Sequence, residues 1–288
     1  MKVLVFGKTG QVARELLNQG DVTALGREDA DLSVAGACAK QINDRAPDCV
    51  INAAAYTAVD RAEDDEDQAT RINGNAPTEM AQACAKLGIP FVHISTDYVF
   101  EGTGERPWQP MDNPKPLGAY GRSKLAGEIG IRESNCIHTI LRTSWVFSAY
   151  GGNFLKTMLR LAETRDALTI VADQIGGPTP ADSIAAACLS IADQLTKDPS
   201  KAGTYHFSGT PDASWADFAR EIFRQSEKTV DVQDIPTSAY PTPAQRPLNS
   251  RLDCSSTRKA FDIERPDWAE GIGRALAKLR DLEMKGIK

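Results

Sequence analysis

The sequence has little of what metal centres and disulfide-stabilised folds require. Its 288 residues include three histidines and six cysteines, and no two cysteines form a C-x-x-C pair. A zinc site is therefore not expected. We expect the cysteines, which lie in apolar or helical contexts, to be buried, reduced thiols, as in proteins of the cytosol. They are Cys38, Cys49, Cys84, Cys136, Cys188 and Cys254.

The chain also lacks long apolar runs and an excess of positive charge. It contains no stretch of about 18 apolar residues, so no membrane span is expected. The apolar segment 1–7 is too short for a signal peptide. The net charge of −6 argues against nucleic acid or an anionic membrane as the main partner. We expect a cytoplasmic protein with a small-molecule ligand, and an anionic ligand remains compatible because local groups decide its binding.

The first half of the chain alternates short apolar runs with helical patterns. Strands are expected at 3–6, 22–25, 49–53, 91–94 and 137–142, with helices at 11–18, 34–45, 69–87 and 118–132. Continuous apolar strands separated by helices are typical of a parallel sheet that is covered on both faces. The fold class is therefore α/β, with a doubly wound parallel sheet of the Rossmann type. Ligands of this fold bind at the carboxyl ends of the strands.

The second half is less regular and predicts a smaller C-terminal α/β lobe that binds the substrate. Residues 236–253 contain four prolines and read as a long ordered loop. We assign residues 1–148 to the dinucleotide-binding domain and 149–288 mainly to the substrate lobe. The segments of about 172–200 and 240–256 are expected to return to the first domain.

A glycine turn follows the first expected strand. Gly7 and Gly10, with the small Ala13, form G-x-x-G-x-x-A between a strand and a helix. In dinucleotide-binding folds such glycines allow a tight turn and a close approach of the diphosphate to the helix N-terminus. We expect Gln11 and Val12, which open that helix, to join this cofactor site. A purely structural turn is the alternative.

The end of the second strand favours NADP. NAD enzymes often carry an acid there to bind the ribose hydroxyls, but this chain has Gly26 followed by Arg27. Glu28 weakens the inference, Arg27 could be a surface residue, and NADH stays open. Asp31 and Leu32 are candidates for contact with the adenine, and a helix-capping role is the alternative for Asp31.

Small residues mark the end of the third strand. Ala53, Ala54 and Ala55 would let the middle of a dinucleotide lie flat on the backbone, and Tyr56 follows them. Tight helix packing is the alternative explanation. We include all four residues in the expected cofactor site.

Tyr120 and Lys124 lie four residues apart in an expected helix, and therefore on one face. A cation beside a phenol favours the phenolate and moves its acidity toward neutral pH. Such a tyrosine can protonate a carbonyl oxygen as hydride reaches the carbon. Lys124 could also hold the nicotinamide ribose. Ser95 and Thr96, at the end of the fourth strand, offer a hydroxyl that orients the carbonyl.

The ordered set of motifs resembles the extended short-chain dehydrogenases/reductases and, within them, the dTDP-4-dehydrorhamnose reductases. The likeness spans nearly the whole chain. Its segments are FGKTGQV, NAAAYTAVDRAE, STDYVFEG, YGRSKLAGE, LRTSWVF, NFLKTMLRLA, DQIGGPT and RPLNSRLD. The resemblance implies that NADPH reduces a dTDP-4-keto-6-deoxysugar at C4 to dTDP-L-rhamnose.

The resemblance also implies residue roles. Thr96 rather than Ser95 would be the catalytic hydroxyl, Tyr120 the acid and Lys124 its partner. Arg246 would bind the diphosphate, although it could instead brace its loop, and Trp145 would cover the sugar unless it is a core aromatic. The implied substrate contacts are Asp97, Tyr98, Trp145, Asn153, Arg246, Asn249 and Ser250.

Some relatives dimerise around Mg²⁺, and Glu15, Asp182 and Glu283 match the carboxylate positions. Three separate surface charges are the alternative. Two other functions also stay open. One is an epimerase or dehydratase that retains NAD, and the other is a non-catalytic subunit resembling the regulatory subunit of methionine adenosyltransferase.

Overall fold

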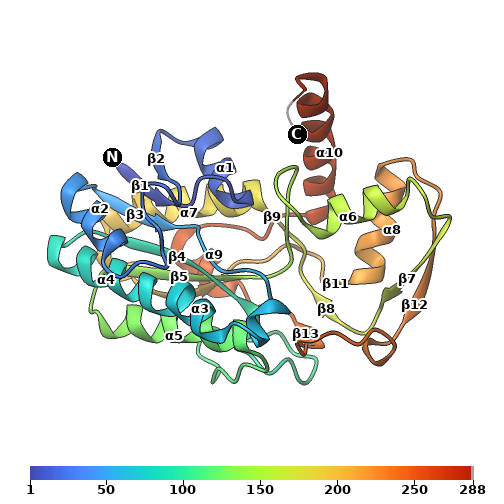
Figure 1. Cartoon of the computed structure of the whole chain (residues 1–288), viewed down its shortest axis with the longest axis horizontal. Coiled ribbons are helices and arrows are strands. Elements are labelled where there is room, and N and C mark those ends of the chain that lie inside the picture. The colour runs from blue at the N-terminus through green and yellow to red at the C-terminus, as the bar shows by residue number, and fades with distance from the viewer. Residues whose placement is uncertain (287–288) are drawn as a thin grey trace.

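The computed structural model describes residues 1–286, and its centre is a sheet of six parallel strands in the order β10-β5-β4-β3-β1-β2 (Figure 1). This order reverses direction between β1 and β3, so the sheet is doubly wound and the predicted fold class is confirmed. The strands of this sheet are β1 (Val3–Phe6), β2 (Val22–Leu25), β3 (Cys49–Asn52), β4 (Phe91–Thr96), β5 (His138–Thr143) and β10 (Gly203–His206).

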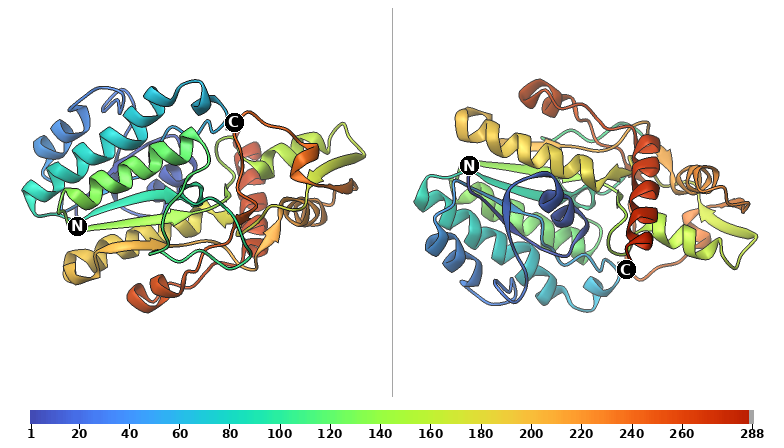
Figure 2. Two further views of the ribbon diagram at one scale, coloured as in Figure 1. Left: turned by 90° about the horizontal axis from the view of Figure 1, so that it is seen from below. Right: turned by 90° about the horizontal axis from the view of Figure 1, so that it is seen from above.

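Alternate side chains of each strand enter two separate cores, because successive residues of a strand point to opposite faces. Val3 and Val5 join the core under α1, α7 and α9, whereas Leu4 and Phe6 join the core under α2, α4 and α5. Figure 2 shows these two helix layers on either side of the sheet. The helices are α1 (Gln11–Gln19), α2 (Ala37–Arg45), α4 (Ala76–Leu87), α5 (Ala119–Glu133), α7 (Ala181–Lys197) and α9 (Ser255–Phe261).

The helix expected at 69–87 is longer and is interrupted by a π turn. It begins as α3 (Glu66–Thr70), widens at Arg71–Asn75 and continues as α4. A π turn inserts one extra residue into the helix and is frequent at functional sites. Here it turns the buried Asn73 toward the loop after β3 and toward α5.

The remaining elements form a smaller lobe with its own apolar core, seen beside the main sheet in Figure 1. Its α8 begins with a capping box in which Ser214 and Asp217 satisfy each other's backbone amides. The lobe contains α6 (Phe154–Leu161), α8 (Trp215–Gln225) and α10 (Trp268–Met284), with β6 (Val146–Phe147), β7 (Ala167–Val171), β8 (Ile175–Gly176), β9 (Thr179–Pro180), β11 (Ala213–Ser214), β12 (Asp231–Ile235) and β13 (Asn249–Ser250).

The strand β10 completes the main sheet by pairing with β5. One strand of the smaller lobe was not visible in the sequence pattern. The segment of β12 was not expected to be a strand, because Asp231, Gln233 and Asp234 make it polar; it pairs with β7 at the outside of the lobe. The proline-rich segment 236–253 is irregular apart from one 3₁₀ turn and β13.

The six cysteines are buried and free, as expected. Burial raises the pKa of Cys49 and Cys188 to about 12, which keeps both thiols protonated and unreactive at neutral pH. Within residues 1–286, no helix combines the length and the apolar character needed to span a bilayer.

Candidate active site

The glycine turn leads from β1 into α1 with its backbone against the end of β3. Gly7 has φ +107°, and a Cβ built there would lie 3.2 Å from the carbonyl carbon and oxygen of Ala53. Gly10 has φ −69° and precedes α1, and its Cβ would come no closer to the chain than 4.0 Å. The fold therefore requires glycine at position 7, whereas the space beside Gly10 stays open toward solvent.

That open space suits a diphosphate. Within the described residues, no side chain caps the N-terminus of α1, and its first turn holds no acidic residue. The amides at the start of α1 are thus free to bind an anion, which the helix dipole also favours.

The two glycines should respond differently to replacement by alanine. We expect Gly10→Ala to keep a nearly unchanged melting temperature, because its Cβ meets nothing in the chain. The methyl group would occupy the place of the diphosphate and weaken NADPH binding roughly tenfold, or about 1.4 kcal/mol. Gly7→Ala should instead destabilise the fold by about 1–3 kcal/mol through backbone strain. Thermal unfolding and a fluorescence titration with NADPH measure both effects, and a Gly10→Ala protein that binds NADPH normally would contradict this assignment.

The ends of β1 and β2 carry two exposed cations, each paired with a carboxylate. Lys8 Nζ lies 3.0 Å from Glu28, and Arg27 Nε lies 2.9 Å from Asp31. Asp31 also accepts hydrogen bonds from the amide and hydroxyl of Ser33, and these bonds together with Arg27 lower its pKa to about 2. Leu32 packs against the core beside α2.

The residues after β3 line the same edge of the sheet. The Ala53 amide donates to the carbonyl of Phe6 (2.9 Å), which holds this loop against the glycine turn. Ala53 and Ala54 are half-buried and Ala55 is exposed. The Tyr56 amide donates to Asn73 Oδ1 (2.8 Å). The π turn therefore fixes the loop on which the dinucleotide is expected to lie.

The structure separates the two candidate hydroxyls at the end of β4. Ser95 points into the core and donates to Glu128 Oε1 (2.7 Å). Thr96 is 6% exposed, its hydroxyl donates to Asp97 Oδ1 (3.1 Å), and it lies close enough to Tyr120 to lower the pKa of that phenol. The geometry therefore supports Thr96, although its catalytic role stays a prediction.

Tyr120 is less acidic in the chain alone than the sequence suggested. Burial raises the pKa of its phenol to about 12, the hydrogen bond with Thr96 opposes this rise, and the charge of Asp97 adds to it. Lys124 is not among the groups that oppose this rise, and its Nζ donates to the carbonyl of Ile94 (2.7 Å). The phenol thus stays protonated at neutral pH, as a proton donor must.

Three of the expected substrate residues lie around this pair of hydroxyls. The Tyr98 ring packs edge-on against Tyr120, with centroids 5.5 Å apart. Burial raises the pKa of Asp97 to about 6, and the nearby hydroxyls of Ser250 and Thr96 oppose this rise. Asp97 Oδ2 is buried and has no hydrogen-bond partner among residues 1–286. An orphaned carboxylate oxygen of this kind is suited to accept a bond from a sugar hydroxyl.

Trp145 follows β5 in a strained, left-handed conformation with φ +50°. Its ring stacks on that of Trp215, with centroids 3.7 Å apart and planes 12° apart. Trp215 is in turn held by a bond from its Nε1 to Gln174 Oε1 (3.1 Å). Such strain persists only where the surroundings impose it, and it often marks a functional position.

Arg246 lies on the proline-rich segment and is paired with a residue that the sequence did not single out. Its Nη2 and Nη1 lie 2.9 and 3.1 Å from the two carboxylate oxygens of Asp60, in the loop after β3. This fork joins the segment 236–253 to the loop after β3, near Tyr98.

Two other candidates have their amides engaged within the chain. Asn153 caps α6 and donates to Gln11 Oε1 (2.9 Å), so it lies beside the glycine turn. Asn249 donates to the carbonyl of Arg106 (2.8 Å) and accepts from Arg251. Both side chains brace loops at the site, and their contact with substrate stays a prediction.

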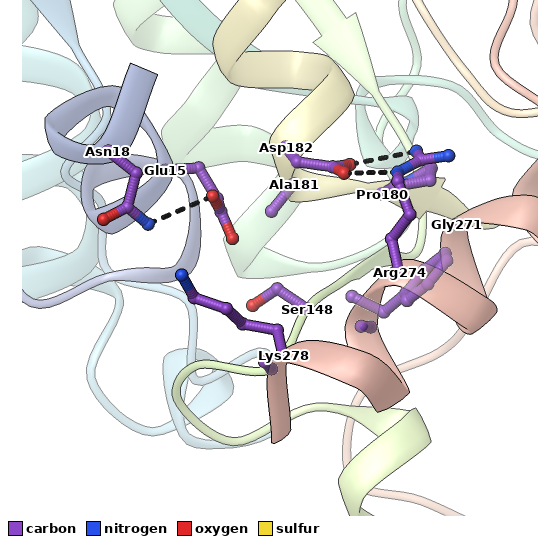
Figure 3. A pocket seen from close by; sticks show the side chains of 12 residues that line it. Glu15, Asn18, Ser148, Pro180, Ala181, Asp182, Gly271, Arg274 and Lys278 are labelled. Atoms are coloured by element: carbon purple, nitrogen blue, oxygen red, sulfur yellow. Dashed lines mark hydrogen bonds and ion pairs between the residues drawn. The ribbon is translucent and has the colours of Figure 1, made fainter. Parts of the chain in front are cut away.

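The Mg²⁺ site is not supported. Across residues 1–286, no group of three or more His, Cys, Asp or Glu side chains is arranged to hold a metal. Glu15 and Asp182 do line one pocket of about 200 Å³ between α1, α7 and α10, shown in Figure 3. Arg274 binds the carboxylate of Asp182 (2.7 Å) and Lys278 reaches into the same pocket, so cations already compensate these acids. Glu283 is not among the pocket residues.

The sequence missed several residues because their roles depend on distant partners. Asp60 holds Arg246, Asn73 holds the loop after β3, and Trp215 stacks on Trp145. Asp60 does lie inside the motif NAAAYTAVDRAE, which was the only available signal.

The arrangement defines a class of enzyme. The glycine turn after β1 is combined with a threonine at the end of β4 and with a tyrosine and a lysine on α5, as in Rossmann-fold oxidoreductases of the short-chain dehydrogenase type. The chain belongs to the family described as the RmlD substrate binding domain, whose model matches residues 1–281. It is accordingly an oxidoreductase.

Known proteins of this family resemble the chain over almost its whole length. The dTDP-4-dehydrorhamnose reductase of Sinorhizobium fredii is 44% identical, covering 95% of this chain and 96% of that protein. A crystal structure of such a reductase from Clostridium acetobutylicum has a TM-score of 0.90 at 35% identity, covering 97% of this chain and all of that one. The Bacillus anthracis reductase, solved in complex with NADP, has a TM-score of 0.90 at 33% identity, with coverage of 96% and 100%.

Proposed function

We propose that the chain reduces dTDP-4-dehydrorhamnose to dTDP-L-rhamnose with NADPH. The observation that carries this proposal is the meeting of the Thr96 and Tyr120 hydroxyls beside the unpartnered Asp97 carboxylate, at the end of β4. A ketone oxygen placed between the two hydroxyls could accept a hydrogen bond from Tyr120, and one from Thr96 once the Thr96 hydroxyl, which has a single hydrogen, turns away from Asp97.

The residues present fit NADPH. The open cradle at Gly10 suits its diphosphate, and Lys8 and Arg27 suit a 2′-phosphate, since no acid follows β2 directly. Their present partners, Glu28 and Asp31, are surface carboxylates, and exposed ion pairs of this kind are weak. When bound, NADPH supplies the hydride that reaches C4 of the sugar.

Tyr120 donates its proton to the oxygen on C4 while the carbonyl carbon accepts hydride, and the ketone becomes an alcohol. Thr96 holds the oxygen in the plane in which Tyr120 reaches it. Before substrate arrives, Asp97 holds the Thr96 hydroxyl in place by accepting from it (3.1 Å), and that hydrogen passes to the ketone oxygen when the sugar binds. The phenolate left on Tyr120 is stabilised by a cation, for which Lys124 is the nearest candidate on the same helix face.

Arg246 would bind the diphosphate of the sugar nucleotide, because a guanidinium fork matches phosphate oxygens. Its bond to Asp60 holds it at the edge of the site before substrate arrives. Trp145, fixed by its stack on Trp215, would cover the apolar face of the deoxysugar.

The test is to follow NADPH absorbance with dTDP-4-dehydrorhamnose generated by the preceding enzymes. We expect turnover with NADPH, and we expect the rate to saturate at a lower concentration of NADPH than of NADH. Thermal unfolding with dTDP, UDP or GDP tests the nucleotide separately, since a ligand that binds only the native state raises its stability. Purified protein that carries bound NAD and consumes no NADPH would favour the epimerase or dehydratase alternative and contradict this proposal.

A further inference from the structure

A row of buried polar side chains crosses the sheet beneath Tyr120. Asn52 at the end of β3, His93 on β4 and Lys124 on α5 are 1%, 0% and 2% exposed. Asn52 Nδ2 lies 3.1 Å from His93 Nδ1, and His93 Nε2 lies 3.1 Å from Lys124 Nζ. Asn52 and His93 are register partners on β3 and β4, so their side chains lie on the same face, under α5. The two contacts join the three side chains into one hydrogen-bonded row.

The orientation of Asn52 determines where the imidazole carries its proton. Asn52 Oδ1 accepts the amide hydrogen of Ala54 (3.1 Å), so the amide nitrogen of Asn52 faces His93. Because an amide nitrogen only donates, Nδ1 of His93 must accept. A neutral imidazole then has its hydrogen on Nε2, which points at Lys124. Burial lowers the pKa of His93 well below its ordinary value, so the ring is neutral at physiological pH.

This hydrogen limits the charge of Lys124. An ammonium group has three donors and no lone pair, so it cannot accept the Nε2 hydrogen. The contact is a hydrogen bond only when Lys124 is a neutral amine, which can accept from Nε2 while donating to the carbonyl of Ile94 (2.7 Å). The ammonium form of Lys124 would need the other tautomer of His93 and a rotated Asn52 amide. That rotation would break the hydrogen bond from the Ala54 amide to Asn52 Oδ1, next to the glycine turn.

The groups around Lys124 are consistent with a neutral amine at this position. Burial lowers the pKa of Lys124 to about 8, and Glu128 opposes the decrease. Glu128 is itself held by Arg142 (2.6 Å). Tyr120 lies one turn before Lys124 on α5, and the charge of Asp97, in the turn after β4, acts on Tyr120. Lys124 can therefore exchange between amine and ammonium near the working pH.

We propose that His93, oriented by Asn52, is a positioning residue that holds the Lys124 amine beneath Tyr120 and sets the upper pH limit of the reaction. This inference rests on the proposed function, in which the ammonium form stabilises the Tyr120 phenolate. By donating a hydrogen bond to the amine, His93 favours the uncharged form of Lys124 and lowers the pKa of its ammonium group. The pH at which kcat declines on the alkaline side therefore depends on the His93 contact.

The kinetic test compares His93→Leu with the wild type from about pH 6 to pH 10. We expect kcat to fall at least about tenfold, because Nζ loses its fixed position, with NADPH affinity within a few-fold of normal. The apparent alkaline pKa of kcat should rise, since the donor that favours the amine is gone. If leucine acted only by making the surroundings of Lys124 more apolar, the apparent alkaline pKa of kcat would fall instead. An alkaline pKa that stays or falls would overturn the proposal.

His138→Leu is the matched control. His138 begins β5 at the opposite end of the sheet, where its Nδ1 contacts the carbonyl of Cys136 (2.9 Å). We expect this variant to keep the wild-type kcat and pH profile.

A second measurement needs neither substrate nor turnover. The ¹⁵N shifts of histidine-labelled wild-type protein distinguish the two ring tautomers, and the His138→Leu spectrum removes one of the three histidines from the assignment. We expect His93 to carry its hydrogen on Nε2 above about pH 8 and to change tautomer as Lys124 gains its proton. Nε2 without hydrogen at every pH would contradict the proposal even if the reductase activity were established. Conversely, the expected tautomer in a protein without reductase activity would separate this contact from the proposed function.

Discussion

Tyr120→Phe lowers kcat for the reduction of the sugar ketone by about 10²- to 10⁴-fold, the usual contribution of a positioned general acid. The change removes one oxygen from a buried ring that packs edge-on against Tyr98, so the fold is retained. The hydroxyl that Thr96 contacts is lost, and no other described group replaces its proton. Steady-state kinetics with NADPH measures the effect, and the melting temperature checks the fold.

Tyr205→Phe is the matched control. Tyr205 lies on β10, and its hydroxyl donates to the carbonyl of Lys201 (2.8 Å), away from the ends of the strands where the site lies. Its removal should leave kcat unchanged within about twofold. If Tyr120→Phe behaved like Tyr205→Phe, another group would have to donate the proton, and the proposed mechanism would be wrong.

Glu128→Gln destabilises the fold by about 3–5 kcal/mol, since it leaves a buried cation without its partner. Glu128 and Arg142 are 0% and 1% exposed. Arg142 donates to both carboxylate oxygens, at 2.8 and 2.6 Å, and Ser95 donates to the first of them at 2.7 Å. The free energy of unfolding from urea titration measures the loss.

The same pair predicts a pH dependence. Burial tends to raise the pKa of Glu128, but Arg142, Ser95 and Arg132 outweigh it and hold the pKa below its ordinary value of 4.5. A depressed pKa in the folded state gives stability that is present above pH 4.5 and is lost as the pH falls through the folded-state pKa. As the pH falls below 4.5, the free energy of unfolding of the wild type should therefore decrease more steeply than that of Glu128→Gln.

Glu66→Gln provides the comparison on an exposed pair of similar geometry. Arg122, on the same helix as Glu128, donates to both oxygens of Glu66 at 2.8 Å, but the two side chains are 45% and 42% exposed. We expect a loss of no more than about 1 kcal/mol. Equal losses in the two variants would mean that burial of the Glu128 pair carries no special energetic weight.

Much of the nucleotide site could be predicted because its signals are local. Gly7 and Gly10 stand between an apolar strand and a helix within a few residues, and the positive φ of Gly7 belongs to that turn. The spacing of Tyr120 and Lys124 placed them on one face of α5. The end of β4 offered both Ser95 and Thr96, and only the family resemblance favoured Thr96; the direction of Ser95 toward Glu128 is a physical reason for the same choice.

The substrate side was harder because its contacts join distant parts of the chain. Arg246 was expected to face a phosphate, and its carboxylate partner, Asp60, lies 186 residues away in sequence. The amides of Asn153 and Asn249 are engaged by loops that no local pattern connects to them. Of the three acids expected to bind Mg²⁺, Asp182 is paired with Arg274 and Glu15 shares a pocket with Lys278, and both cations are brought in by the last helix.

The sequence by itself determined the class of fold, the dinucleotide turn and the helix face that carries Tyr120 and Lys124, because backbone conformation and residue periodicity are properties of neighbouring residues. Only the tertiary structure decided which buried side chain meets which. The row Asn52–His93–Lys124, the fork between Arg246 and Asp60, and the pair Glu128–Arg142 arise where strands and helices from different segments are stacked. Their charges and proton positions depend on burial and on direction, and both are set by that stacking.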